Sequence, residues 1–283
     1  MLPKIDAVIK IGGSAVTNKS EKETLKPGPL QKAAECIRQC HDSGITCVVV
    51  HGAGSFGHHH AREFKINKGL PIALSGKDRR EKILGYSLTR QSVQKLNQVL
   101  VNALLELGVP AIAFSPGDSW LLQQRELVRG PTETVGRLLK HGFVPVLHGD
   151  LCMDDILGFS ILSGDTVIKK LCSSFDVKRV VFLTDVCGIY DRPPSEPDAQ
   201  FLPSICVRAD GTVTAGIKTS QSQNDVTGGI LLKLNTAFDI VKQSEGRCPV
   251  FVCAVDSSDA PVVISTSDVD SRNVHCTKIS MLT

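Results

Sequence analysis

The sequence lacks the features that mark several large classes of protein. It has no run of 18 or more apolar residues, so no membrane-spanning helix is predicted. Its N-terminus has no long apolar stretch of the kind found in secretory signals, and we expect a cytoplasmic protein. The 32 Lys and Arg residues nearly balance 29 Asp and Glu residues, and a net charge of +3 gives no general attraction to nucleic acid or membranes.

Motifs for several common chemistries are also missing. The sequence has no G-x-x-x-x-G-K-[ST] phosphate loop and no G-x-S-x-G hydrolase elbow. None of the ten cysteines is part of a C-x-x-C pair, and the histidines at residues 58–60 have no Cys or acidic partner at ligand spacing, so no protein-held metal is predicted. Cys47, Cys206 and Cys253 lie inside apolar runs, which indicates buried thiols in a reducing compartment.

The sequence does contain two glycine-rich stretches that directly follow strand-like runs. Residues 10–14 (K-I-G-G-S) follow the strand-like run 7–9, and residues 51–58 (H-G-A-G-S-F-G-H) follow the β-branched run 46–50. Glycine has no Cβ and tolerates positive φ, so the N–H groups of such loops can converge on an anion. Two loops of this kind favour an anion site over an ordinary surface turn.

Strand-like and helix-like patterns alternate along the chain. The clearest predicted strands cover residues 7–11, 46–50, 111–114, 144–147, 179–183 and 249–255, and the clearest predicted helices cover residues 30–42, 78–107, 134–141, 166–172 and 227–242. Weaker patterns predict hairpins over residues 120–131 and 151–162, a break in the long helix near Gly85 and a further strand over residues 261–264. The alternation predicts an α/β fold, an αβα three-layer sandwich with a mainly parallel central sheet, whose ligands bind beyond the carboxyl ends of the strands.

Three charged side chains are expected at that edge of the sheet. Lys10 ends the first strand, where a buried ammonium is costly unless it meets an anion, although a Lys there can also extend to solvent. Lys233 follows Gly228 and Gly229 in the first turns of a helix; a cation there opposes the helix dipole, so it either serves an anionic ligand or is simply solvated. Asp165 lies near a helix start, where it is either a cap or a partner for lysines or a metal-bound nucleotide.

In chain order these motifs resemble those of the amino acid kinase superfamily and, within it, the isopentenyl phosphate kinases. The matching stretches are K-I-G-G-S (10–14), H-G-A-G-S-F-G-H (51–58), H-G-D (148–150), I-L-S-G-D (161–165), L-T-D-V (183–186) and N-D-V-T-G-G (224–229), the last followed by Lys233. The first stretch is common to the superfamily, whereas the histidine that closes the second is more specific, because carboxylate kinases of the superfamily generally lack it. The chain departs from the pattern after residue 264, where a Gly-Thr is expected near the end and residues 275–277 are His-Cys-Thr.

The resemblance implies an amino acid kinase fold in a single domain over residues 1–283, with an acceptor-binding lobe over about 1–170 and a nucleotide-binding lobe over about 171–283. It implies a homodimer that uses ATP and Mg²⁺ to phosphorylate isopentenyl phosphate to isopentenyl diphosphate, for isoprenoid biosynthesis in the mevalonate pathway. The alternatives are another small phosphate or phosphonate kinase of the same fold, such as a fosfomycin kinase, and a non-catalytic nucleotide-binding sensor.

The resemblance also implies a role for each matched residue. The nucleotide-binding residues would be Lys10, Ile11, Gly12, Gly13, Ser14, Gly54, Asp165, Asp185, Gly228, Gly229 and Lys233. The acceptor-binding residues would be Ala53, His58, Gly149 and Asp150. The catalytic residues would be Lys10, Lys19, Lys233 and His58, with Lys233 on the γ-phosphate and Lys19 on the phosphoryl group in transfer. Because a phosphate oxygen is already an anionic nucleophile, this chemistry needs charge neutralisation rather than a strong base, and His58 would clamp the acceptor phosphate.

Overall fold

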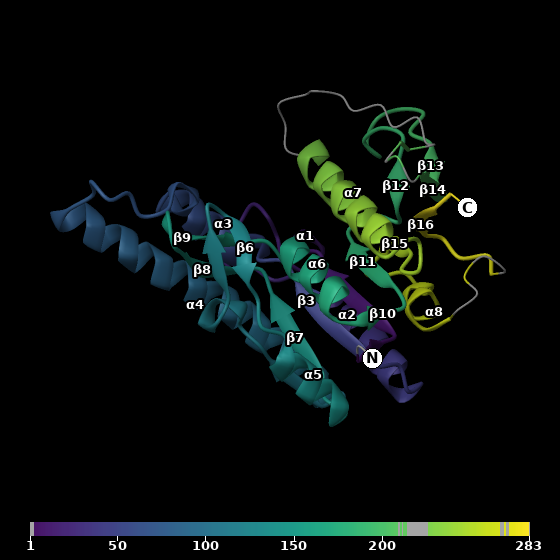
Figure 1. Cartoon of the computed structure of the whole chain (residues 1–283). Coiled ribbons are helices and arrows are strands. Elements are labelled where there is room, and N and C mark those ends of the chain that lie inside the picture. The colour runs from purple at the N-terminus through teal and green to yellow at the C-terminus, as the bar shows by residue number, and fades with distance from the viewer. Residues whose placement is uncertain are drawn as a thin grey trace.

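The computed structural model of the chain describes residues 3–208, 210, 212–213, 226–266, 269 and 272–282, with the backbone alone for residues 226–232. Its centre is an eight-stranded sheet (Figure 1). In spatial order the strands are β14 (Ser204–Val207), β16 (Thr277–Met281), β15 (Val250–Ala254), β11 (Val180–Thr184), β2 (Ala7–Ile11), β3 (Cys47–His51), β7 (Val144–His148) and β4 (Ala111–Ala113). The six strands from β15 to β4 are parallel, whereas β16 pairs antiparallel with β15 and β14 runs parallel to β16.

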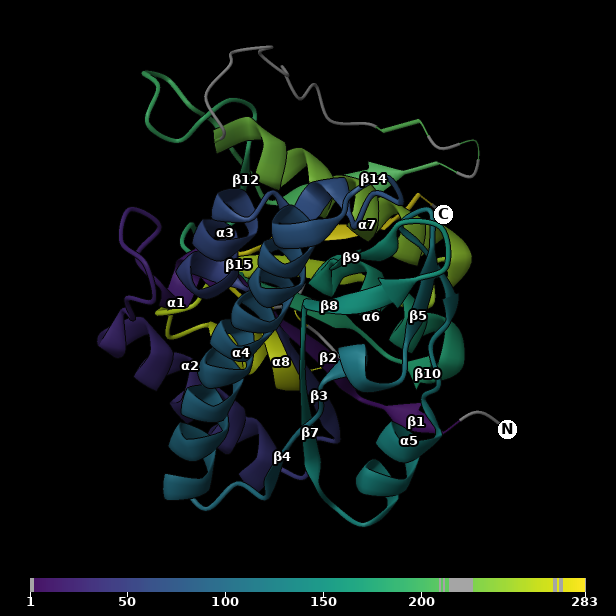
Figure 2. The ribbon, with the colours of Figure 1, turned by 90° about the vertical axis from the view of Figure 1, so that its left-hand side faces the viewer.

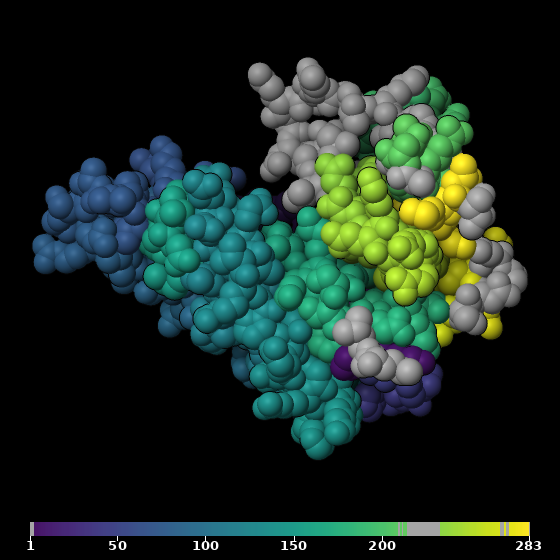
Figure 3. Space-filling model, viewed as in Figure 1, coloured from purple at the N-terminus to yellow at the C-terminus, as the bar shows by residue number. Residues whose placement is uncertain are grey.

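Helices cover both faces of this sheet, which confirms the predicted three-layer sandwich (Figures 1 and 2). One face carries α2 (Pro27–Asp42), α4 (Gly76–Glu106) and α8 (Ala260–Ser265), and the other carries α5 (Glu133–Lys140), α6 (Gly164–Ser174) and α7 (Val226–Gln243). Helices α6 and α7 lie side by side (Figure 3). No described helix combines the length and the apolar composition needed to span a bilayer.

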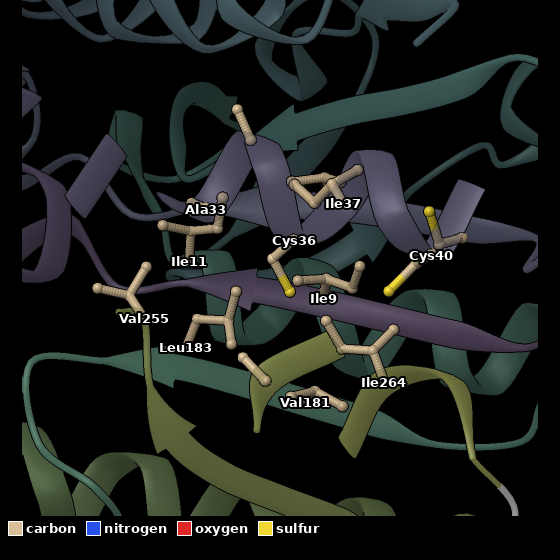
Figure 4. Packing of buried hydrophobic residues seen from close by; sticks show 14 of the residues in the cluster. Ile9, Ile11, Ala33, Cys36, Ile37, Cys40, Val181, Leu183, Val255 and Ile264 are labelled. Carbon is tan, nitrogen blue, oxygen red and sulfur yellow. The ribbon is translucent and has the colours of Figure 1, made fainter. Parts of the chain in front are cut away.

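The side-chain alternation of β2 assigns its residues to the two faces. Ile9 and Ile11 pack toward α2 in one buried cluster, together with Cys36 of that helix (Figure 4). Val8 packs in the second cluster, toward α6 and α7. Because successive side chains of a strand point to opposite faces, Lys10 lies on the same face as Val8. This orientation directs the ammonium of Lys10 toward the helices that carry the other predicted phosphate-binding residues.

A second sheet of four strands lies beside the first half of α4 (Figure 2). It consists of β6 (Glu126–Arg129), β5 (Leu121–Gln123), β8 (Asp150–Asp154) and β9 (Gly158–Leu162), in that order. Leu151 and Phe159 of this sheet pack against Ile66, and Tyr86 of α4 donates a hydrogen bond of 3.1 Å to the Leu151 carbonyl. The remaining elements are β1 (Lys4–Ile5), α1 (Gly13–Val16), α3 (Gly54–Glu63), η1 (Ile66–Lys68), η2 (Pro116–Asp118), β10 (Asp176–Val177), β12 (Ile189–Tyr190) and β13 (Phe201–Leu202).

Both predicted hairpins are confirmed, but three predictions were wrong. The stretch 51–58 is only partly a loop, because α3 begins at Gly54. Helix α4 is not broken at Gly85; a Cβ there would lie 2.3 Å from the Phe64 ring, so this glycine allows close helix packing. Residues 261–264 belong to helix α8, with Pro261 in its first turn. The strand prediction failed because so short an apolar run has no periodicity that distinguishes a strand from a helix.

Candidate active site

Lys10 is a buried cation near the carboxyl end of β2. Its residue exposure is 7%, and its Nζ lies 3.5 Å from Oδ1 of Asp165 in the first turn of α6. An isolated buried ammonium is strongly destabilising, so the carboxylate offsets its charge. Ser163 supplies the helix cap by accepting a hydrogen bond from the Thr166 N–H. Of the two roles that the sequence left open for Asp165, the structure therefore supports the partner of a lysine.

Lys233 of α7 belongs to the same group of charges. Burial lowers the pKa of Lys233 below its ordinary value, and the positive charge of Lys10 lowers it further, while Asp185 and Asp165 raise it and Lys19 lowers it. Asp185 is exposed directly after β11, and Lys19 is exposed on the turn that follows α1. The structure thus brings together three lysines and two carboxylates from five separate segments. A group with an excess of positive charge suits a polyanionic ligand.

The two glycine stretches approach each other closely at this edge. A Cβ at Gly13 would lie 2.3 Å from the backbone N of Gly54, and a Cβ at Gly54 would lie 2.2 Å from Oγ1 of Thr17. Gly54 also has a φ of +51°, which a residue with a side chain rarely adopts. The Gly12 N–H donates to the Leu183 carbonyl at 2.8 Å and so connects the end of β2 to β11. This N–H is therefore not available to a ligand.

The N-terminus of α3 has backbone donors for an anion. Within the described ranges, the N–H groups of Ala53 and Gly54 have no hydrogen-bond partner in the chain, whereas the next N–H, of Ser55, donates to Thr17 Oγ1 at 3.0 Å. The N-terminus of a ten-residue helix carries partial positive charge, and phosphate groups bind at such ends. Two adjacent N–H groups at this end form a candidate phosphate site beside the lysines.

The three consecutive histidines of α3 have different surroundings. His58 is exposed. Nε2 of His59 lies 3.0 Å from the Lys19 carbonyl, and Nε2 of the buried His60 lies 3.3 Å from Oε1 of Glu23. His59 therefore supports the turn that carries Lys19, whereas His60 is bonded to Glu23 within the fold and His58 is accessible to a ligand bound at the start of α3.

Gly149 and Asp150 lie at the junction of β7 and β8. The Gly149 N–H donates to the His51 carbonyl at 3.0 Å, which holds this turn against the end of β3. The buried carboxylate of Asp150 accepts hydrogen bonds from the Gly117 N–H at 2.9 Å and from Arg90 Nε at 3.3 Å. Gly149 thus lies against the end of β3, and its acceptor-side role stays a prediction, whereas the contacts of Asp150 favour a role in holding the neighbouring backbone.

The other predicted residues lie near the same edge of the sheet, and their roles stay predictions. Ile11 is buried in β2, and the carbonyl of Ser14 in α1 accepts a hydrogen bond of 2.8 Å from Lys26 Nζ. Gly228 and Gly229 lie in the first turns of α7, ahead of Lys233. Residues 224–225 of the N-D-V-T-G-G stretch lie outside the described residues.

Sequence reasoning missed four polar residues directly behind the site: His51, Asn97, Arg90 and His148. They are buried or half-buried and hydrogen-bonded to the glycine turns or to each other. A signal for two of them was present: of the three His-Gly dipeptides, at residues 51–52, 141–142 and 148–149, the first and the third lie at the ends of neighbouring parallel strands.

Comparison with known proteins identifies the fold family. The sequence profile of the amino acid kinase family matches residues 7–254. The chain belongs to this family. An isopentenyl phosphate kinase of Arabidopsis thaliana is 36% identical over 84% of this chain and 84% of its own length, and one of Methanothermobacter thermautotrophicus is 33% identical over 80% and 84%. An X-ray structure of an isopentenyl phosphate kinase superposes with a TM-score of 0.77 at 25% identity, covering 96% of this chain and 99% of that one. Within the amino acid kinase family the chain therefore groups with the isopentenyl phosphate kinases, as the motifs predicted.

Proposed function

We propose that the protein transfers the γ-phosphoryl group of ATP to isopentenyl phosphate and so forms isopentenyl diphosphate. The observation that carries this proposal is the convergence of Lys10, Lys19 and Lys233 at the sheet edge that also holds the N-terminus of α3. Both reactants are anions that repel each other, and positioned cations and N–H donors offset that repulsion. The relatives at 33–36% identity support the choice of acceptor.

The nucleotide is assigned to the lysine side of the site. Lys10 and Lys233 bind the ATP phosphates, and the missing side chains of Gly12 and Gly13 let the end of β2 pack closely against β11 and the start of α3. Lys19, on its exposed turn, acts on the phosphoryl group as charge develops during transfer. Asp185 borders the nucleotide, because it directly follows β11 next to the lysines.

The acceptor phosphate is assigned to the start of α3. The N–H of Ala53, the side chain of His58 and the backbone of Gly149 surround it, with Gly54 between acceptor and nucleotide. An imidazole there can donate to a phosphate oxygen, while no carboxylate is needed as a general base. The exposed histidine favours a phosphate or phosphonate acceptor over an amino acid carboxylate.

The first turns of α4 are a candidate surface for the isoprenoid tail. Ile83 is 44% exposed and Leu84 is 56% exposed, so neither side chain is part of the buried core. Both follow the acceptor helix α3 along the chain and belong to the helix whose later turns contact the site through Arg90. Apolar area here favours a substrate with a hydrocarbon tail.

We further propose that Mg²⁺ enters with ATP and is shared with its phosphates. Asp165 and Asp185 supply hard oxygen donors close to the lysines, and among the described residues no group of three His, Cys, Asp or Glu side chains could hold a metal alone. The resemblance also supports a cytoplasmic homodimer in the mevalonate pathway, with acceptor and nucleotide lobes over about residues 1–170 and 171–283.

The test is a panel assay. Purified protein with ATP and Mg²⁺ is offered isopentenyl phosphate, fosfomycin, UMP, aspartate and glutamate, and ADP release is measured with product analysis. We expect the highest kcat/KM with isopentenyl phosphate. Faster turnover of fosfomycin or UMP would reassign the acceptor, and no ADP release with any acceptor would support a nucleotide sensor.

A further inference from the structure

Two buried histidines lie behind the candidate site, one at the end of each strand that leads into an acceptor-side turn. His51 ends β3 and His148 ends β7, and these residues are paired in register across the two strands. His51 is 1% exposed and His148 is fully buried, and their rings stack with centroids 5.4 Å apart. The rings are therefore too deep to touch a substrate, and their effect must pass through the groups that they bind.

The hydrogen bonds of His51 define its tautomer. The amide nitrogen of Asn97 lies 3.1 Å from the Val146 carbonyl, which can only accept, and 3.1 Å from Nε2 of His51. Asn97 donates both hydrogens, so Nε2 of His51 is an acceptor and the ring proton is on Nδ1. That Nδ1–H donates to the Gly52 carbonyl at 3.0 Å.

His148 repeats this arrangement with different partners. The side-chain amide of Gln94 donates to Oγ of Ser115 at 3.3 Å, and that hydroxyl in turn donates to Nε2 of His148 at 3.1 Å. The proton of this ring is again on Nδ1, which donates to the Gly149 carbonyl at 2.9 Å. Each histidine therefore binds the carbonyl of the glycine that follows it.

A bound carbonyl fixes the orientation of a whole peptide plane. In a trans peptide the C=O and the N–H of the next residue point in opposite directions, and the described chain has no cis peptide. When His51 holds the Gly52 carbonyl, the Ala53 N–H points away from the buried ring, and this N–H has no partner in the described chain. The Gly149 plane is held next to α6, where a Cβ on Gly149 would lie 3.0 Å from the Gly164 nitrogen.

Helix α4 holds both histidines from one face. Arg90, Gln94 and Asn97 have spacings of four and three residues, which align them along one side of the helix. Arg90 binds Asp150, Gln94 reaches His148 through Ser115, and Asn97 binds His51. One rigid helix thus sets the positions of both acceptor-side turns.

We propose that His51 and His148 are paired positioning residues: His51 orients the Gly52–Ala53 peptide, whose N–H has no partner in the described chain, toward the acceptor phosphate, and His148 fixes the turn at Gly149 beside it. The inference rests on the proposed function for the identity of the acceptor. Neither ring exchanges a proton with substrate; each acts only by fixing backbone before the acceptor arrives, which lowers the ordering cost of binding.

Paired substitutions separate the two ends of the ring. His51→Asn keeps a donor at the position of Nδ1, while His51→Gln keeps a polar atom near Nε2 and removes that donor. We expect His51→Gln to lower kcat/KM for isopentenyl phosphate at least tenfold, His51→Asn to retain activity within about threefold of the wild type, and both to leave the KM for ATP within about twofold. His148→Asn and His148→Gln should show the same order.

His60→Gln is the matched control, because His60 is also buried but bonds Glu23 rather than a glycine carbonyl. It should leave kcat/KM nearly unchanged even if its melting temperature falls as far as that of His51→Gln. Equal losses for the Asn and Gln variants, or losses that follow melting temperature across all of them, would overturn the positioning role.

A measurement without substrate keeps this inference separate from the proposed function. Long-range ¹H–¹⁵N NMR of the histidine rings reports which nitrogen carries the proton. We expect Nδ1–H tautomers for His51 and His148, and an Nε2–H tautomer in either ring would overturn the inference whatever the acceptor is. If the tautomers hold but isopentenyl phosphate is not turned over, the proposed function fails and the orientation of the peptides stands.

Discussion

Replacing His58 with alanine tests the acceptor clamp most directly. Helix α3 rises about 1.5 Å per residue, so His58 lies about 6 Å along the axis from Gly54, within reach of a phosphate bound at the helix start. The lost hydrogen bond involves a charged phosphate and contributes about 1.5–3 kcal/mol. We therefore expect His58→Ala to reduce kcat/KM for isopentenyl phosphate by about ten- to a hundredfold, with the KM for ATP and the melting temperature nearly unchanged.

The assay is steady-state ADP release at varied isopentenyl phosphate, repeated for His58→Gln, His59→Ala and His60→Ala. His58→Gln keeps a donor and should retain more activity than His58→Ala. His59→Ala loses the contact with the Lys19 carbonyl and should lower kcat modestly, and His60→Ala should mainly lower stability. Equal losses in all three alanine variants, or a parallel loss of ATP affinity in His58→Ala, would show that His58 only packs the helix.

Four further outcomes are expected from the same structure. Lys19→Ala should lower kcat more than it raises the KM for ATP, because its charge acts as the phosphoryl group transfers; a pure KM effect in steady-state kinetics would make it a ground-state binding group. Gly164→Ala should lower kcat at least tenfold with little change in melting temperature, because the added Cβ would lie 2.8 Å from Cε of Lys10 and displace that flexible side chain; unchanged kcat would refute this reasoning. Burial lowers the pKa of His51 from 6.5 to about 3, so between these values the unfolded chain binds a proton that the folded chain excludes, and this group should reduce the free energy of unfolding by about 1.4 kcal/mol per pH unit as pH falls. In urea titrations at pH 6.5 and 5, the free energy of unfolding should therefore differ less between the two pH values for His51→Asn than for wild type, and an equal difference would contradict the assignment. Alanine substitutions over residues 83–88 should change the preference for alkyl tail length, since each methylene contributes about 0.8 kcal/mol, and an unchanged preference in competition assays would place the tail elsewhere.

The sequence was most informative where local pattern and burial coincide. The strand at residues 7–11 and the long helix from about residue 78 were both predicted within two residues of their observed ends. The role of Gly85 could not be predicted in the same way, because a side chain there is excluded by the Phe64 ring, which lies just after helix α3. A glycine that breaks a helix and a glycine that permits close packing look identical in a sequence.

The second glycine stretch shows how a local motif can mislead. Residues 52–57 read G-x-G-x-x-G and join strand β3 to helix α3, which is also the local arrangement of a dinucleotide-binding turn. Here the turn packs against Gly13 of a second glycine stretch and lies beside three lysines, which supports the proposed site for two phosphate-bearing reactants. The order of several motifs along the chain, rather than any one of them, carried the correct prediction.

The glycines of two separate motifs have a common physical cause in the burial of Lys10. Gly164 has no side chain because a Cβ would lie 3.0 Å from the Lys10 ammonium nitrogen, and Gly149 has none because a Cβ would lie 3.0 Å from the Gly164 backbone nitrogen. The H-G-D and S-G-D motifs are therefore two layers of backbone packed over one lysine, and the second also supplies its counter-ion, Asp165. A pattern of residues along the chain cannot reveal this, because the distance that excludes a methyl group at residue 149 is set by a chain segment fifteen residues later. It follows that a loss of activity on changing Gly149 does not by itself identify a substrate contact, since the same change displaces the backbone that packs over Lys10.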